Sequence, residues 1–574
     1  MAMTGRVRRV NGPLVEIEGL DRVAVMDVLD IGDANLTAEV VAVRPGRTTA
    51  QVYDYTGGLS VGVPVTARGR PLSARLGPGL LGCAFDGLLR RLDRAGTWLD
   101  PGWQLAAQED RWKFVPAAAA GRLMGPGDQL GVVPTSSGVD HRVLVPPGVA
   151  GTLEWISPEA EVTDGQPVAR VGDRDVALTE WWPVRRARPY TTRQDLSVPL
   201  VTGQRVIDLL YPIAKGGTAA VPGGFGTGKT VLLQQIVKWC RADVIVFVGC
   251  GERGNELADA LTDLAGLDDP VTGRRLVERT VVIANTSNMP VMAREASIYT
   301  GMTVAEYYRD MGYDAVLLAD STSRWAEALR EFSSRNGELP VEEGYPAVLP
   351  SALAAFYERA GRVVTTSGRE GSVTVIGAVS PPGGDVTEPV SAHTERFVRC
   401  LWSLDRDLAY ARHYPAVSWH RSFSRDAAGV ASWYSATGRV AWEENRRRAG
   451  ALLAEADRVE PVADLVGVTG LPDRERLVLV CAALIRSAVL QQNATSPNDA
   501  SCSPDKQSAL IGAALAVFDR AVELIGRGVR ASAIEQVDMS TLVRAGNETG
   551  TDDATGVIDR ARRVIADLDA LMGG

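Results

Sequence analysis

Residues 223–230, Gly-Gly-Phe-Gly-Thr-Gly-Lys-Thr, have the types and the spacing of a phosphate-binding loop. They fit the pattern G-x-x-x-x-G-K-[ST] without a mismatch. Glycines let successive backbone N–H groups turn toward phosphate oxygens, a lysine neutralises the β- and γ-phosphates, and a threonine offers its hydroxyl to Mg²⁺. The sequence therefore predicts a nucleoside triphosphate site made of Gly223, Gly224, Phe225, Gly226, Thr227, Gly228, Lys229 and Thr230.

The segments on either side of this loop support the same interpretation. Residues 218–221 form a short apolar run typical of a buried strand, and residues 231–237 have the pattern of an amphipathic helix. A helix that begins at the loop directs the positive end of its dipole at the phosphates. A chance glycine-rich turn is the alternative, and it does not explain why a strand and a helix flank the loop.

Hydrolysis also requires a carboxylate that organises the metal and a group that orients water. Asp320 ends the apolar run 315–319, where an aspartate that holds Mg²⁺ through bound water is expected. The alternative role for Asp320 is to cap the helix that follows it.

Glu252 is the candidate that orients water. It follows the apolar run 244–248, so we expect it at the carboxyl edge of a sheet, where ligands bind in open α/β folds. A carboxylate there can polarise a water molecule in line with the γ-phosphorus. Arg253 would contact the phosphates or brace Glu252. Spacing alone does not exclude a solvated Glu–Arg pair.

The order of patterns along the chain predicts a multidomain α/β protein. Short strands separated by turns over residues 1–70 predict a small N-terminal β-barrel. Residues 71–111 form a connector that belongs to the central domain, with a short helix expected over 80–92. Residues 112–188 predict a β-rich insertion that ends near Trp181 and Trp182, which are either local core or a partner surface.

Residues 189–440 alternate strands with helices, which is the mark of a mostly parallel sheet. They predict a central P-loop domain of the RecA-like kind. Residues 441–574 predict a C-terminal helical domain, since apolar residues repeat at helical spacing over 510–524 and Gly526 is a plausible stop. The apolar runs that predict strands in the central domain are 244–248, 280–284, 315–319 and 373–376.

Composition narrows the choice of function. The chain has 574 residues and a net charge of -9, which argues against a nucleic-acid partner because such proteins leave a basic footprint. Six cysteines and four histidines are scattered without a zinc-like cluster, as expected in a reducing compartment. The N-terminus lacks the apolar stretch of a signal peptide, and the chain has no apolar run of about 18 residues. We expect a cytoplasmic protein that reaches a membrane only through partners.

Several longer strings resemble the catalytic A subunit of V-type (archaeal and vacuolar) rotary ATPases. The resemblance runs from Gly12-Pro13 to Cys502-Ser503-Pro504, and the insertion matches the lobe that separates this subunit from the F-type β subunit. The strings that carry it, besides the phosphate-binding loop, are residues 251–256, 287–297, 320–331, 343–347 and 380–385.

This resemblance implies a hexamer of three A and three B subunits around a central-stalk shaft, held by peripheral-stalk subunits. ATP or ADP would bind at A–B interfaces, with Lys229, Glu252 and Arg253 catalytic and with Thr230 and Asp320 at Mg²⁺. The arginine finger would come from the B-type subunit, so the isolated chain should hydrolyse ATP poorly. Other chains in the membrane sector would move H⁺ or Na⁺.

The resemblance also implies an adenine site at Tyr414, Gln492 and Thr495. Tyr414 could stack on the base, or it could be a core aromatic residue. The family usually has an aromatic residue where this chain has Thr495. Loss of one aromatic face would cost about 1 kcal/mol of stacking, which bears on nucleotide affinity and base selectivity and leaves the phosphate chemistry unaffected.

Three other functions compete with a motor subunit. A hexameric nucleic-acid translocase of the termination-helicase type also joins a β-barrel to a P-loop domain, but it needs basic, aromatic-laced loops, and residues 5–70 offer only Arg6, Arg8 and Arg9 at their start. A structural subunit that binds nucleotide without turnover would not need Lys229, Glu252 and Asp320 together. A secretion-system ATPase lacks the long insertion.

Overall fold

The computed structural model describes residues 3–20, 22–95, 110–135, 137–269 and 272–572. The chain divides into two compact units that are each discontinuous in sequence. The first unit comprises Met1–Gln194, Ala242–Val379 and Thr387–Phe397, and the second comprises Asp195–Arg241, Ser380–Val386 and Val398–Gly574. The domain boundaries expected from the sequence, near residues 70, 111, 188 and 440, stay predictions.

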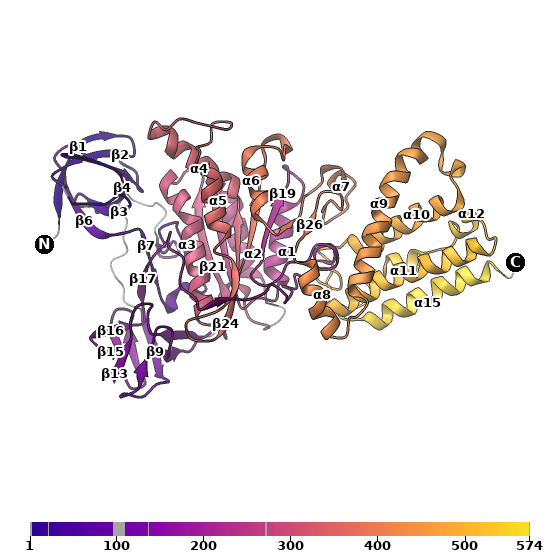
Figure 1. The fold of residues 1–574 in the computed structure, drawn as a ribbon, viewed down its shortest axis with the longest axis horizontal. Helices are drawn as coiled ribbons and strands as arrows, with labels where there is room; N and C mark the ends of the chain where they lie inside the picture. The colour runs from indigo at the N-terminus through magenta and orange to yellow at the C-terminus, as the bar shows by residue number, and fades with distance from the viewer. Residues whose placement is uncertain (1–2, 21, 96–109, 136, 270–271, 573–574) are drawn as a thin grey trace. The chain divides into compact units, whose positions relative to one another are not determined.

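The first unit begins with the predicted β-barrel, which is confirmed (Figure 1). Six strands close in the order β1-β2-β5-β4-β3-β6. Side chains such as Val15, Ile17 and Leu29 are completely buried and fill the interior, while charged residues alternate with them on the outside, as the two-residue period of a strand requires. The strands are β1 (Thr4–Asn11), β2 (Leu14–Glu18), β3 (Asp27–Ile31), β4 (Leu36–Arg44), β5 (Arg47–Val52) and β6 (Pro64–Pro71).

The β-rich insertion consists of two four-stranded sheets, ordered β10-β13-β15-β16 and β12-β11-β9-β14. Both sheets contribute to one apolar core, in which Phe114, Leu130 and Leu153 are fully buried. A two-residue turn, Gly172-Asp173, joins β15 to β16. The strands are β9 (Arg111–Pro116), β10 (Leu123–Met124), β11 (Gln129–Val133), β12 (His141–Leu144), β13 (Gly151–Ile156), β14 (Ala160–Thr163), β15 (Pro167–Val171) and β16 (Arg174–Ala177).

The two tryptophans that close the insertion have different environments. They lie on β17 (Glu180–Pro183), which pairs with β7 (Ser73–Leu76). Trp182 is buried and its indole N–H donates to the carbonyl of Arg186 at 2.7 Å, so it is local core. Trp181 is half exposed, and the guanidinium of Arg70 lies 3.9 Å from the centre of its ring.

The prediction of a helix over residues 80–92 is wrong. The segment contains one turn of 3₁₀-helix, Pro78–Leu80, and a short strand, β8 (Ala84–Phe85). Asp86 is buried and accepts hydrogen bonds from the backbone N–H groups of Leu88 and Arg90, both at 2.9 Å. An aspartate that binds nearby backbone N–H groups competes with helix formation, and Leu89 has a φ of 61° that interrupts a helix.

A parallel sheet forms the centre of the first unit, as predicted. It is ordered β24-β22-β20-β21-β8, and its central strands are buried on both faces, which explains their continuous apolar sequences. The strands are β20 (Val244–Glu252), β21 (Thr280–Thr286), β22 (Asp314–Asp320) and β24 (Glu370–Val379), with β23 (Gly361–Val364) antiparallel beside β24 and β18 (Thr192–Arg193) beside β23. The helices are α2 (Gly254–Gly266), α3 (Val291–Asp310), α4 (Thr322–Arg335), α5 (Leu349–Tyr357) and α6 (Pro389–Phe397), and a 3₁₀ turn covers Leu276–Arg279.

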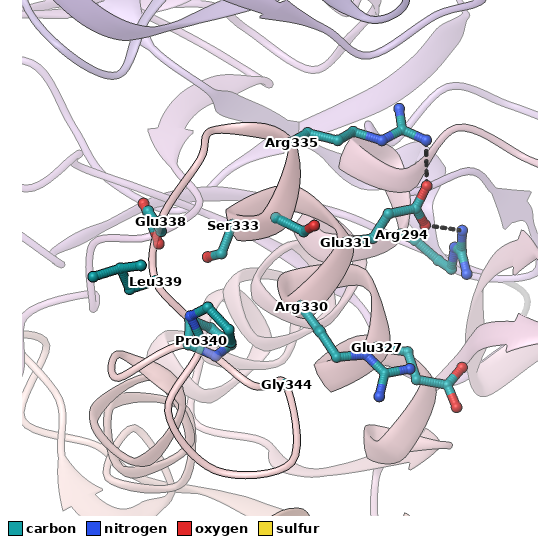
Figure 2. A pocket seen from close by; sticks show the side chains of 12 residues that line it. Arg294, Glu327, Arg330, Glu331, Ser333, Arg335, Glu338, Leu339, Pro340 and Gly344 are labelled. Carbon is teal, nitrogen blue, oxygen red and sulfur yellow. Dashed lines mark hydrogen bonds and ion pairs between the residues drawn. The ribbon is translucent and has the colours of Figure 1, made fainter.

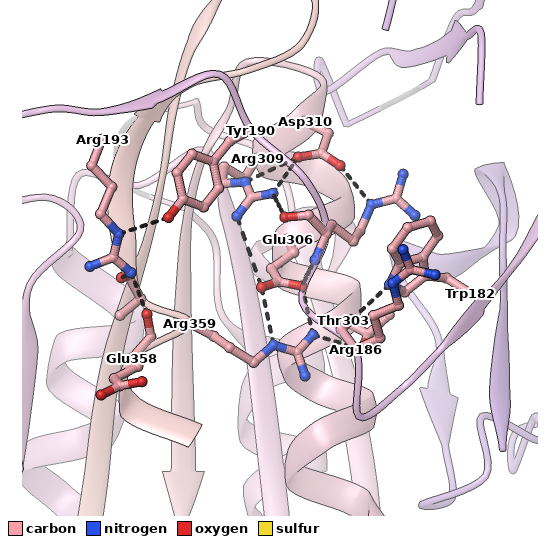
Figure 3. Close-up of polar contacts among 12 residues, drawn as sticks. Trp182, Arg186, Tyr190, Arg193, Thr303, Glu306, Arg309, Asp310, Glu358 and Arg359 are labelled. Carbon is pink, nitrogen blue, oxygen red and sulfur yellow. Dashed lines mark hydrogen bonds and ion pairs between the residues drawn. The ribbon is translucent and has the colours of Figure 1, made fainter. Parts of the chain in front are cut away.

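A buried network of charges connects α3 to two other segments, one that follows the insertion and one that follows α5 (Figure 3). Glu306, which is fully buried, accepts hydrogen bonds from Arg359 at 2.6 and 3.1 Å and from the backbone N–H of Arg188 at 3.0 Å. Asp310 accepts from the guanidinium groups of Arg188 and Arg309, both at 2.6 Å. Because such charges are costly to leave unpaired, they fix the packing of these segments.

The second unit carries the phosphate-binding loop between β19 (Thr218–Pro222) and α1 (Lys229–Trp239), so the predicted strand and helix are confirmed. β25 (Cys400–Leu401) lies parallel to β19, and β26 (Phe423–Ser424) lies antiparallel to β25. The unit also contains a π-helical turn at Val206–Leu210, a 3₁₀ turn at Pro382–Gly384, α7 (Arg406–Tyr410) and α8 (Ala427–Ala436).

The predicted C-terminal helical region completes the second unit. Ser503 caps α11 by accepting from the backbone N–H of Lys506, Pro504 is its first residue, and the helix ends at Gly526 as expected. The helices are α9 (Trp442–Val466), α10 (Asp473–Leu484), α11 (Pro504–Gly526), α12 (Ala531–Ile534), α13 (Ser540–Val543), α14 (Ala545–Glu548) and α15 (Ala554–Ala570), with a 3₁₀ turn at Val468–Gly470 and a π-helical turn at Ile485–Leu490.

The Glu306 network generates a stability prediction. Glu306→Ala leaves buried guanidinium groups without their carboxylate, so the free energy of unfolding of the first unit should fall by about 3 kcal/mol. The loss is measured as a lower midpoint of thermal or urea unfolding. Glu444→Ala is the matched control, because Glu444 forms an exposed ion pair with Arg447, and it should leave both midpoints unchanged. Equal midpoints for the two variants would contradict a supporting role for the network.

Candidate functional site

The phosphate-binding loop has a backbone that only glycine tolerates at several points. Gly226 and Gly228 have φ values of 79° and 83°, in the left-handed region. A side chain at Gly223 would place its Cβ 2.9 Å from the Cβ of Leu404. Because Gly228 occupies the cap position of α1 and has no side chain, it cannot cap the first N–H groups of the helix. The positive end of α1 is therefore available to an anion.

Lys229 is the first residue of α1, and its ammonium lies over the loop. The Nζ atom donates to the carbonyl of Gly223 at 3.2 Å and to the hydroxyl of Ser380. Ser380 was not among the predicted site residues, and its signal in the sequence is that it directly follows the apolar run 373–379. Thr230 and Phe225 are exposed.

A cavity of about 570 Å³ adjoins the loop in the second unit. Gly228 lines it together with Tyr414, Gln492 and Thr495, the three residues predicted at the adenine site. Tyr414 is 42% exposed, and its ring approaches within 3.3 Å of the point where a Cβ on Gly228 would lie. The structure thus brings an accessible aromatic face to the edge of the phosphate-binding loop, and Tyr414 is not a core residue.

Gln492 supports the wall of this cavity. Its side chain is buried, accepts from the backbone N–H of Arg205 at 2.8 Å and donates to the carbonyl of Gly203 at 2.9 Å. Its own backbone N–H donates to the carbonyl of Tyr414 at 2.8 Å. Thr495 is exposed and donates its hydroxyl to the Oδ1 of Asn493 at 2.8 Å.

The two candidate carboxylates lie at one edge of the sheet in the first unit. Glu252 is the last residue of β20 and Asp320 is the last residue of β22. These strands are parallel neighbours with Gly249 opposite Asp320, so both residues lie at the carboxyl edge, as expected. Asp320 is buried, and Ser321 provides the cap of α4 by accepting from the N–H of Arg324. Ser321, and not Asp320, thus occupies the cap position of α4.

A bulge at Gly251 sets the direction of the end of β20. The pairing of β20 with β21 shifts between Cys250 and Glu252, and Gly251 has a φ of 72°. A Cβ on Gly251 would lie 2.8 Å from the Cβ of Arg324 and 3.1 Å from the Cδ of Arg294. Two arginines thus pack against the residue that precedes Glu252.

Arg324 and Arg294 were not predicted as site residues. The pKa of Arg324 is raised, chiefly by its hydrogen bonds to Glu327 and also by the negative charge of Glu252. Both arginines occupy the first turn of a helix that follows a parallel strand, and that position was the signal available in the sequence. Arg253 instead projects into solvent, with its side chain 76% exposed and 4.0 Å from Glu256. The expectation that Arg253 braces Glu252 is not what the structure shows.

A second cavity, of about 610 Å³, lies beside α4 in the first unit (Figure 2). Glu331 lies between Arg335 and Arg294 there, 3.9 Å from the latter. The guanidinium of Arg330 lies 5.0 Å from the centre of the Tyr345 ring. Three arginines and three glutamates line the cavity, so its lining charges balance: Arg294, Arg330, Arg335, Glu327, Glu331 and Glu338. This balance gives a free anion no net attraction.

Across the part of the chain that the structure describes, no helix is both long enough and apolar enough to cross a lipid bilayer.

Four family descriptions match successive parts of the chain. They are the β-barrel domain of the ATP synthase alpha/beta family (residues 7–69), the barrel-sandwich domain of the ATP synthase alpha/beta subunit (104–185), the nucleotide-binding domain of the ATP synthase alpha/beta family (203–424) and the C-terminal domain of V and A type ATP synthase (431–533).

Curated proteins match over almost the whole length. The A subunit of the A-type ATP synthase of Methanopyrus kandleri is 47% identical over 551 residues, covering 94% of this chain and 93% of the relative. The V-type ATP synthase alpha chain of Nitrosococcus oceani is 49% identical over 554 residues, with the same coverage. Among solved structures, the ATPase EscN of the enteropathogenic E. coli type III secretion system matches with a TM-score of 0.65 at 22% identity, covering 89% of this chain and 99% of EscN. That likeness concerns the fold alone.

The cavity beside Tyr414 generates a binding prediction. Thr495→Phe should add a second aromatic face and tighten ATP binding by about 1 kcal/mol, or about fivefold in Kd. Calorimetric titration with ATP measures the change, and titration with tripolyphosphate, which has no base, is the control and should not change. An unaltered Kd for ATP would mean that residue 495 does not contact the base.

Proposed function

The chain belongs to the family of A-type and V-type ATP synthase A (alpha) subunits, and we propose that it binds and turns over ATP as the catalytic subunit of such a rotary complex. The observation that carries the proposal is the phosphate-binding loop, with Lys229 above it and an uncapped helix behind it. The family descriptions that match the chain extend from the β-barrel to the C-terminal helices. One site serves both hydrolysis and synthesis, because the reaction is reversible.

The phosphate end of the nucleotide is bound by the loop. Backbone N–H groups of residues 223–228 and the N-terminus of α1 would hold phosphate oxygens, and Lys229 would exchange its contacts with Gly223 and Ser380 for the β- and γ-phosphates. The charge of Lys229 and the loop dipoles would then stabilise the negative charge that develops during phosphoryl transfer.

The residues present suit Mg²⁺. This ion is usually bound by one or two protein oxygen ligands together with phosphates and water, and Thr230 offers an exposed hydroxyl while Asp320 offers a buried carboxylate. Thr230 would bind the ion directly and Asp320 partly through water. The ion, when bound, neutralises charge on the phosphates.

Glu252 is proposed to orient the attacking water and to accept its proton during hydrolysis. Its place at the carboxyl edge of the sheet, next to the bulge at Gly251, supports this role. Arg253 would contact the phosphates. Its side chain is exposed, and its ion pair with Glu256 is long, at 4.0 Å.

The base end is proposed to lie in the cavity beside Tyr414, with the ring of Tyr414 stacked on adenine. Thr495 would lie near the base without stacking on it. Gln492 would act by holding the cavity wall in place, because both polar groups of its side chain are already bonded.

Membership of this family implies a multisubunit complex. We propose an alternating hexamer with a B-type subunit that supplies an arginine finger, together with central-stalk and peripheral-stalk subunits. Membrane association and the transport of H⁺ or Na⁺ would be carried out by other chains of the complex. The nucleic-acid translocase alternative loses support, since the net charge is -9 and relatives named as ATP synthase subunits match almost the whole chain.

Two substitutions test the division of roles. In a complex co-expressed with the B-type subunit, Lys229→Ala should weaken ATP binding about 30-fold through loss of charged contacts and abolish turnover. Glu252→Gln should bind ATP normally, while turnover falls about 100-fold or more. Magnesium-dependent phosphate release and nucleotide titration measure the two effects. Wild-type turnover in both variants would refute the proposal.

The bulge before Glu252 generates a further prediction. Gly251→Ala combines an unfavourable φ with a contact 2.8 Å from the Cβ of Arg324, so Glu252 should move while the phosphate-binding loop does not. We expect turnover to fall about tenfold or more with the Kd for ATP unchanged. Gly273→Ala, at another left-handed glycine with open space around it, controls for backbone strain alone. A loss of ATP affinity in Gly251→Ala would contradict this separation.

A further inference from the structure

Lys506, in the first turn of α11, is a lysine buried without exposure to solvent. Its ammonium donates to three backbone carbonyls, those of Asn498 at 3.0 Å, Gly546 at 2.9 Å and Thr549 at 3.0 Å. All three of its protons are thus used, which is the condition for keeping such a charge inside a protein. The acceptors belong to two separate segments, so the ammonium joins them.

The three carbonyls require an ammonium rather than a guanidinium. Only five of the 61 lysines and arginines in the chain are lysines. The three N–H bonds of an ammonium diverge from one atom, whereas the donors of arginine lie in a plane and form a fork. Arginine at this position would keep the charge and lose the geometry.

The two joined segments are the loop 493–499 and α14. They are tied again by the side-chain amide of Asn498, which donates to the carbonyl of Asn547 at 3.1 Å. At Gly546 the backbone of α14 packs so closely that a Cβ would lie 2.9 Å from the Oδ1 of Asp499 and 3.2 Å from an Nη of Arg205. The contact leaves no room for a side chain.

Arg205, which is also buried, holds the same loop through a second set of contacts. Its guanidinium pairs with Asp499 and donates to the carbonyl of Val489 at 2.6 Å. The other oxygen of Asp499 accepts from the backbone N–H of Asn493 at 2.6 Å. The loop that carries Thr495 is therefore held by two buried cations, Lys506 through the carbonyl of Asn498 and Arg205 through Asp499.

Both joined segments line the cavity beside the phosphate-binding loop. Asn493, Thr495 and Asp499 line it from the loop, and Arg544, Gly546 and Asn547 line it from α14 and the residue before it. Tyr414 lines the same cavity. Arg544 and Asn547 are exposed, and they offer N–H donors and an amide oxygen that suit the edge of a purine base or the hydroxyls of a ribose.

We propose that Lys506 is a positioning residue for the nucleoside end of the ATP site, and that Arg544 and Asn547 are specificity-determining contacts held in place by it. The inference rests on the proposed function. Lys506 does not touch the nucleotide. It holds α14 against the loop 493–499 and thereby sets the distance between the wall that carries Asn547 and the wall that carries Thr495.

The test compares a nucleotide with its phosphate chain alone. The full-length chain is titrated by calorimetry with ATP and with tripolyphosphate, for wild type, Lys506→Met, Lys506→Arg and Asn547→Ala. Lys506→Met should weaken ATP binding about tenfold and leave tripolyphosphate binding within about twofold. Lys506→Arg should fall between wild type and Lys506→Met. Asn547→Ala should reproduce the loss for ATP alone.

Lys113→Met is the matched control, because Lys113 forms an exposed pair with Glu159 in the insertion, and it should bind both ligands as wild type does. Equal losses for ATP and tripolyphosphate in Lys506→Met would overturn the inference, and so would unchanged ATP binding in Asn547→Ala. If Lys506→Met does not fold, Asn547→Ala decides the outcome, since its side chain is exposed. Wild-type tripolyphosphate binding that Lys229→Ala does not weaken would overturn the proposed function itself, and this inference with it.

Discussion

Parallel strands end at a common edge of their sheet, and the reactive groups of the first unit depend on this constraint. The apolar runs of β20 and β22 are buried on both faces, so a shift of either strand would disrupt close packing above and below the sheet. Their register places Gly249 opposite Asp320, and Glu252 follows after a bulge. The positions of two carboxylates are therefore consequences of the packing of valines, leucines and isoleucines that take no part in the chemistry.

The parts of the fold that could be predicted from sequence are those governed by local rules. The phosphate-binding loop, the strand and helix beside it, and the places of Glu252 and Asp320 all follow from short patterns. The helix expected over 80–92 failed because Asp86 binds backbone N–H groups that a helix would need. A hydrophobic pattern cannot show that competition.

Contacts between distant segments were beyond the reach of sequence patterns. Arg324 and Arg294 meet Gly251 only because α4 and α3 fold back over the end of β20. Ser380 reaches Lys229 across 151 residues. The sequence does not indicate that Lys506 is buried, because a lysine is expected at the surface unless its partners are known. Its three carbonyl acceptors come from residues that have no distinctive side chains, and backbone acceptors leave no signature in composition or spacing.

The insertion, by contrast, has an apolar core of its own, which both of its sheets share. An exposed turn residue such as Asp173 can therefore change without disturbing the packing of that core, and the turn Gly172-Asp173 lines neither of the two cavities. An affinity peptide or a fluorescent label introduced there would give a handle for immobilising the chain on a surface. The same independence leaves the outer loops of this lobe open to divergence between species while the strands beneath them keep their pattern.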